Sequence, residues 1–278
     1  HAVPYAFDKR THELRPHAGQ LAVAENMRRL TEGSEIIETY KRDRVQDAYS
    51  LRCIPQVAGA GRDALKYVEE KIAIELNSVT DNPIVFHRDG EAISGGNFHG
   101  EPMAMAMDFF GIAAAEFASI AERRVARLVD HKLSGLPPFL VSDSGLNSGF
   151  MIPQYTAAAI VSENKGLAHP SVVDSIPTSA NQEDHVSMGG WSCRKGRNIL
   201  DNTNRVIAIE YLNAAQGMEF HAPLTPGRGS KAAHKEFRRH VPFYEKDCFM
   251  QPLMLKSLEL VKNGSIIDAV EKEIGELL

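Results

Sequence analysis

The chain has 278 residues, 43% of them hydrophobic, with a formal net charge of -5 and a pI near 6.1. That length allows one large domain or two ordinary ones, and the apolar content is ample for a core. The acidic balance argues against a nucleic-acid groove or a membrane-surface helix, and no run approaches the roughly 18 apolar residues of a membrane span. Cys53, Cys193 and Cys248 lack a CxxC spacing, so we expect no disulfide framework or zinc ribbon and a reducing, cytoplasmic location.

The N-terminal stretch, HAVPYAFDKRTHELRPHAGQ, lacks both an initiator Met and the charged-then-apolar order of a signal peptide. We therefore expect this sequence to be the continuation of a longer protein.

The stretch RVQDAYSLRCIPQ, residues 44–56, holds the first candidate site residues. If it is helical, Gln46, Tyr49 and Arg52 stand at three-residue steps on one face. An arginine there can hold a carboxylate through two parallel hydrogen bonds. A solvated or salt-bridged helix end would show the same spacing, and spacing alone favours that simpler interpretation.

The next stretch, VAGAGRDAL at residues 57–65, matches the GxGxxA of dinucleotide-binding turns. Pro55 interrupts the place where such a turn needs a buried strand, so we expect a glycine turn leading into a helix over residues 62–78. Residues 78–102 carry Asn-Pro, Asp-Gly and Gly-Gly pairs, which predict a short hairpin. At its end, Gly95 and Gly96 beside Phe98 suit a ligand pocket, or equally a flexible turn anchored by a buried Phe98.

Residues 101–131 predict a helix of about 46 Å at 1.5 Å per residue, long enough to be the spine of a bundle. Further helical patterns cover residues 153–167, 191–219 and 250–278, the last with an interruption at Asn263 and Gly264. No βαβ alternation is visible. We therefore predict an all-α fold, with long central helices in an extended helical bundle.

The stretch SANQEDHVSMGGWS, residues 179–192, has five hydrogen-bonding side chains in a row, from Asn181 to His185, before the start of a helix. Carboxylates near a buried helix imply a hydrogen-bonded network or a substrate site. Glu183 and Asp184 equally suit helix-capping anions. The HKEFRRH segment, residues 234–240, places its two histidines on different helix faces without a third ligand, so we expect no metal there.

Three of these stretches, QDAYSLR, SGGNFHGEP and NQEDHVSMGG, occur in this order with RPHAGQ upstream and TDNPIVF between. Together they strongly resemble the histidine ammonia-lyase branch of the aromatic amino acid lyase family. The similarity runs from about Phe7 to Glu219 and continues more weakly through PLTPGRG.

The resemblance implies a homotetramer that eliminates ammonia from L-histidine to give trans-urocanate, as in histidine degradation. The electrophile of this family is a methylideneimidazolone group formed autocatalytically from an internal Ala-Ser-Gly. That tripeptide does not occur in this sequence. Residues 1–278 are thus expected to be the C-terminal part of the enzyme, inactive alone, with the electrophile on a missing N-terminal segment. A separate chain that carries this segment is one candidate partner.

Family roles carry over only to the positions that match. Arg52 matches the arginine that grips the substrate α-carboxylate, and Tyr49 matches the tyrosine beside the prosthetic group. Gln46 and Phe98 match further residues of the same site. Glu183 matches the carboxylate that engages the substrate imidazole, which a carboxylate can orient and stabilise in its charged form.

Two other functions stay open. The chain can be a non-catalytic helical scaffold or regulatory subunit, although a scaffold needs none of the five matched residues. It can also belong to an aminomutase that uses the same prosthetic group. If the family's shared site is preserved, residues of several subunits should meet, and exposed apolar helix faces should drive association.

Overall fold

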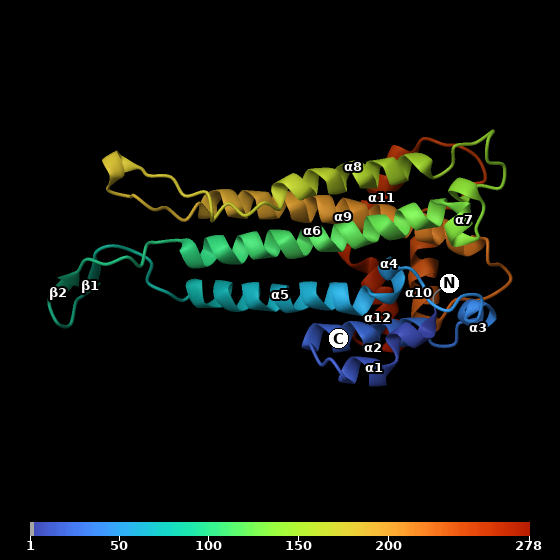
Figure 1. The fold of residues 1–278 in the computed structure, drawn as a ribbon, viewed down its shortest axis with the longest axis horizontal. Helices are drawn as coiled ribbons and strands as arrows, with labels where there is room; N and C mark the ends of the chain where they lie inside the picture. The colour runs from blue at the N-terminus through green and yellow to red at the C-terminus, as the bar shows by residue number, and fades with distance from the viewer. Residues whose placement is uncertain (1–2) are drawn as a thin grey trace.

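The structure, a computed structural model, describes residues 3–278, and its regular secondary structure is helical except for one two-stranded sheet. Its centre is an array of four long helices, α5 (Ile54–Glu75), α6 (Glu101–Val129), α8 (Met151–Leu167) and α9 (Gly189–Glu219). α6 and α9 run in the same direction, and α5 and α8 run the opposite way (Figure 1). The predicted all-α class and the long central helices are confirmed.

Small residues explain why α6 and α9 pack closely along their length. Ala104, Ala114 and Ala118 of α6 are buried, and the Ala114 carbonyl accepts a hydrogen bond of 2.9 Å from the Thr203 hydroxyl of α9. A Cβ added to Gly111 would lie 3.1 Å from Ile199, so a larger residue would crowd the contact. Alanine and glycine therefore set the distance between the two helices.

By length and composition alone, α6 is apolar enough to cross a membrane, which corrects the expectation that no run reaches that length. The core helix of a globular protein has the same length and hydropathy. α6 also buries Asp108, whose carboxylate lies 3.5 Å from the Lys195 ammonium of α9. Buried charges are paired in this way inside a protein core.

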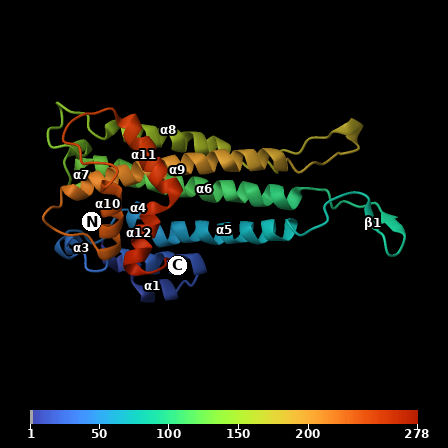
Figure 2. The same cartoon turned by 180° about the vertical axis from the view of Figure 1, so that it is seen from behind.

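Short helices gather around one end of the array. They come from both ends of the chain, so residues near the N-terminus pack beside residues near the C-terminus (Figures 1 and 2). The helices of this layer are η1 (Pro4–Phe7), α1 (Lys9–Glu13), α2 (Ala18–Thr31), α3 (Glu35–Tyr40), α10 (Arg228–Arg238), α11 (Met250–Asn263) and α12 (Ser265–Ile274). The predicted interruption at Gly264 is confirmed, because Gly264 adopts a φ of 77° between α11 and α12.

The opposite end carries two projecting loops (Figure 1). One holds the predicted hairpin, in which β1 (Ile84–Phe86) pairs antiparallel with β2 (Glu91–Ile93). The other is the connection from α8 to α9 and contains the single turn η3 (Ser179–Asn181). Three further short helices, α4 (Tyr49–Arg52), α7 (His131–Ser134) and η2 (Pro138–Leu140), lie at the end with the layer of short helices.

The expected glycine turn at residues 57–65 is wrong, because this stretch is helical and α5 already begins at Ile54. A Cβ on Gly59 would lie 2.4 Å from the Gln20 backbone nitrogen, and one on Gly61 would lie 2.5 Å from the Phe117 ring. The glycines therefore let α2 and α6 approach α5. They serve helix packing and not a phosphate turn.

Candidate active site

α4 is a single helical turn that presents Tyr49 and Arg52. It begins after Ala48, which is extended, and ends at Arg52. Cys53 alone separates it from α5, which carries Pro55 in its first turn. Tyr49 is 71% exposed, and the Arg52 guanidinium lies 4.6 Å from the centre of its ring. The Arg52 Nε is buried and has no hydrogen-bond partner within residues 3–278. A guanidinium with donors still unused can donate hydrogen bonds to a carboxylate.

The prediction that Gln46, Tyr49 and Arg52 share one helix face is wrong for Gln46. Gln46 is exposed and lies outside any helix, before α4 begins. The adjacent Asp47 is buried, and its carboxylate accepts a hydrogen bond from the Val3 backbone nitrogen. This bond to a distant part of the chain fixes the segment in a non-helical path, which spacing along the sequence cannot reveal.

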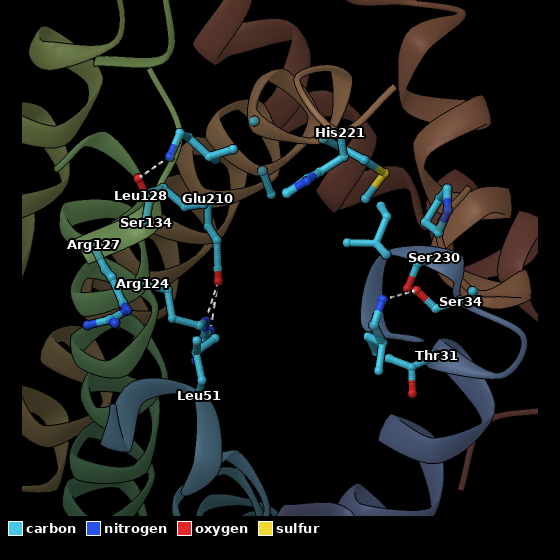
Figure 3. Close-up of a pocket in the computed structure, with 18 of the residues that line it drawn as sticks. Thr31, Ser34, Leu51, Arg124, Arg127, Leu128, Ser134, Glu210, His221 and Ser230 are labelled. Atoms are coloured by element: carbon cyan, nitrogen blue, oxygen red, sulfur yellow. Dashed lines mark hydrogen bonds and ion pairs between the residues drawn. The ribbon is translucent and has the colours of Figure 1, made fainter. Parts of the chain in front are cut away.

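Arg124 of α6 holds α4 in place. Its guanidinium pairs with the Glu210 carboxylate of α9, with Nη2 to Oε2 at 2.9 Å, and Nη1 donates to the Ser50 carbonyl at 3.3 Å. Figure 3 shows Arg124 and Glu210 on the wall of a cavity of about 300 Å³ beside Leu51, with Ser34 and Ser230 on the opposite side. Leu51 of α4 lines this cavity. None of the five predicted site residues lines it.

Phe98 lies at the other end of the array, in the loop before α6. Asn82 holds the base of this loop, because its Oδ1 accepts hydrogen bonds from the Gly95 nitrogen at 2.8 Å and the Ser94 hydroxyl at 3.0 Å. Phe98 is 55% exposed, so it does not anchor the loop as a buried side chain. A Cβ on Gly95 or Gly96 would meet nothing within 4 Å, and packing within residues 3–278 therefore does not require glycine there.

Glu183 lies in the loop before α9 and is exposed, as is Asp184. Its backbone carbonyl accepts a bond of 2.8 Å from the Thr178 nitrogen, and its carboxylate lies 3.4 Å from the Thr178 hydroxyl. α9 begins only at Gly189, so neither carboxylate caps the helix, and the capping interpretation is wrong.

Backbone geometry marks this second loop more clearly than its composition does. Ser179, Ala180 and Asn181 have consecutive φ values of 47°, 53° and 68°. Residues with side chains rarely adopt this left-handed region, and such strain clusters at functional sites. Only Asn181 is a residue type that commonly adopts it, so residue types alone do not predict this backbone conformation.

The structure brings the predicted residues together in two groups and not in one. Gln46, Tyr49 and Arg52 lie near Arg124, whereas Phe98 and Glu183 lie beyond the first residue of α6, Glu101. Arg124 and Glu101 are about 35 Å apart along α6 at 1.5 Å per residue. A single copy of the chain therefore cannot place Arg52 and Glu183 on one small substrate.

The sequence model of the aromatic amino acid lyase family matches residues 1–239. The chain therefore belongs to this family. A histidine ammonia-lyase from Alkaliphilus oremlandii is 56% identical over 97% of the chain, and one from Clostridium tetani is 54% identical over the same share. The chain spans about half the length of these curated relatives, 53% in both.

Solved structures show the same fold. The histidine ammonia-lyase of Trypanosoma cruzi superimposes with a TM-score of 0.90 at 42% identity, covering 98% of this chain and 51% of that one. A tyrosine aminomutase from Streptomyces globisporus superimposes with a TM-score of 0.91 at 37% identity, covering 99% of this chain and 56% of that one. The resemblance to the family found in the sequence is confirmed.

Proposed function

We propose that this chain is the C-terminal, substrate-positioning part of a histidine ammonia-lyase. The complete assembly would remove ammonia from L-histidine to give trans-urocanate, in the reducing cytoplasm that the free cysteines suit. The observation that carries the proposal is Arg52, which is half-buried, stacked on Tyr49 and left with an unpartnered Nε. A guanidinium with unused donors can form two parallel hydrogen bonds to a carboxylate, and the α-carboxylate of an amino acid is such a ligand.

Arg52 and Glu183 would fix the two ends of the substrate. The guanidinium would hold the α-carboxylate, and the Glu183 carboxylate would hold the imidazole ring by accepting its N–H. Tyr49 and Phe98, both largely exposed, would pack against the reacting part of the molecule. When both ends of the substrate are held, less entropy is lost between the bound substrate and the transition state. Positioning of this kind contributes several kcal/mol to catalysis, about 7 or more in favourable cases.

The methylideneimidazolone group fits the residues present. When bound, it supplies the electrophile that makes the substrate amine a leaving group. This chain has no Ala-Ser-Gly from which to form it, but Tyr49 and Phe98 offer exposed aromatic faces for it. We therefore place the group on the N-terminal part of the enzyme, outside these 278 residues, and we expect the chain alone to be inactive.

The separation of Arg52 from Glu183 requires a site shared between copies. Arg52 of one copy would face Glu183 of another, and a homotetramer would bring the two ends of the array together. Closed oligomers with shared sites commonly follow such symmetry. The exposed apolar side chains along α6, including Met105 and Phe109, supply surface for this association.

The test is reconstitution. The chain is assayed for urocanate from L-histidine by ultraviolet absorption, alone and after mixing with a separately made N-terminal segment that contains Ala-Ser-Gly. We expect activity only in the mixture. Association of the two pieces without any urocanate would contradict the proposal and favour a non-catalytic scaffold.

The likeness to a tyrosine aminomutase supports a second candidate, an aminomutase that uses the same group. Product analysis of the same mixture separates the two, because an aminomutase gives a β-amino acid in place of urocanate.

A further inference from the structure

Two loops that carry site residues also bring three metal-binding side chains together. His99 precedes α6, Glu101 is its first residue, and His185 comes from the loop before α9. One ligand atom of each lies within 4.8 Å of the others. We propose that His99, Glu101 and His185 form a binding site for a divalent transition-metal ion such as Zn²⁺.

The two loops lie side by side. A Cβ added to Gly100 would lie 3.1 Å from the Ser187 hydroxyl, so the loop before α9 packs closely against the residue between His99 and Glu101. The His99 and His185 rings are stacked with centroids 5.8 Å apart and planes at 25°. His185 is exposed, which leaves its ring free to turn toward a shared ion.

The hydrogen bond of His99 prepares its ring for a metal. Its Nε2 lies 3.1 Å from the His185 carbonyl oxygen. A carbonyl oxygen only accepts, so Nε2 is the donor, and the neutral ring then has its lone pair on Nδ1. A bond from the second ring nitrogen to a backbone carbonyl is the arrangement that orients metal-binding histidines in proteins.

Glu101 supplies the independent observation. Its Oε2 is buried and has no hydrogen-bond partner within residues 3–278. The N-terminus of α6 attracts an anion and gives one reason for a carboxylate at this position. It does not explain why one oxygen is buried without a donor, which is unfavourable. A bound cation would satisfy that oxygen.

The donor set defines the class of ion. Two imidazoles and one carboxylate suit Zn²⁺ and its neighbours, with a fourth position open to water. Ca²⁺ and Mg²⁺ prefer oxygen ligands alone. The ion would join the loop that carries Phe98 to the loop that carries Glu183. The inference stands apart from the proposed reaction, because metal binding is measured on this chain without its N-terminal partner.

The test is calorimetric titration of the chelator-treated chain with Zn²⁺. We expect one ion per chain with micromolar or tighter affinity, weakened about tenfold or more in His99→Ala and in Glu101→Gln, since even outer-shell changes have effects of this size. The control is His87→Ala, an exposed histidine in the hairpin turn, which should bind as the unaltered chain does.

Circular dichroism of each variant separates lost ligands from lost fold. Titration with Co²⁺ adds a direct readout, because tetrahedral coordination gives intense visible absorption that His99→Ala should abolish. The proposal is overturned if a folded His99→Ala binds Zn²⁺ as tightly as the unaltered chain, or if His87→Ala loses as much affinity as His99→Ala. Zn²⁺ binding no tighter than millimolar would overturn it as well.

Discussion

Arg52 is the residue on which substrate binding depends most directly. Arg52→Lys keeps the charge but loses the planar pair of donors that matches a carboxylate. In the reconstituted assembly we expect kcat/KM for L-histidine to fall by roughly 10- to 150-fold, the effect of about 1.5–3 kcal/mol for a charged hydrogen bond. Steady-state urocanate assays measure it. Arg15→Lys, at an exposed position, is the control, and an equal loss in both variants would contradict a specific role.

Glu35 gives the layer of short helices a pH dependence. Its carboxylate accepts bonds of 2.8 Å from the Thr225 hydroxyl and from the Thr225 nitrogen. These bonds, the side-chain one foremost, lower the pKa of Glu35 below its ordinary value of 4.5. The unfolded chain therefore takes up the proton first, so this stabilisation is complete above pH 4.5 and is lost as the pH falls below it.

Melting temperature measured against pH tests this contact. Glu35→Gln should lower the melting temperature at neutral pH, and the difference from the unaltered chain should shrink as the pH falls below 4.5. Glu70→Gln, an exposed carboxylate of α5, should leave the profile unchanged. A constant difference at every pH would show that the effect is not ionisation of Glu35.

At the scale of elements, the contact of α2 with α5 depends on the absence of a side chain at Gly59. Gly59→Ala would place a Cβ 2.4 Å from the Gln20 backbone, which cannot yield as a flexible side chain does. We expect destabilisation of about 1–3 kcal/mol or more from overpacking. Denaturant unfolding measures it.

Gly166→Ala in α8 is the matched control, because a Cβ there meets nothing within 4 Å. That substitution should stabilise the chain by about 0.5–1 kcal/mol through helix propensity. Effects of the same sign and size at both positions would contradict the packing account.

The long helices were predictable because their apolar pattern is long and repeats at helical spacing. α6, α8 and α9 begin within about two residues of their predicted starts, and the hairpin follows from its turn residues. The predicted α5 is too short, because the sequence around Gly59 and Gly61 is typical of a turn. Glycine is needed at these positions because Gln20 and Phe117 lie too close for a side chain. Distant contacts of this kind do not appear in local sequence.

The same limit applies to the site. Gln46 was misplaced because the bond from Val3 to Asp47 acts between distant residues. The residue types of Tyr49, Arg52, Phe98 and Glu183 drew attention through chemistry and family resemblance. Their division between two ends of the array could not be read from the sequence, because it depends on the direction and length of α6.

For the whole molecule, association should use the exposed face of α6. Met105, Phe109 and Ile112 lie on one side of the helix at spacings of four and three residues and are 53%, 42% and 39% exposed. Ile112→Glu should shift the chain toward smaller species in light scattering without loss of helical content. Val85→Glu, in the hairpin, is the control, and equal masses for Ile112→Glu and the unaltered chain would contradict this interface.

The central claim is that one active site takes Arg52 from one copy and Glu183 from another. Its most direct test is to mix Arg52→Ala chains with Glu183→Gln chains, each inactive alone, in the presence of the N-terminal segment. Random assembly of shared sites should restore about a quarter of the unaltered urocanate activity, because each site draws its two residues from different copies. If the mixed oligomers form and stay inactive, both residues come from the same copy and the account is wrong.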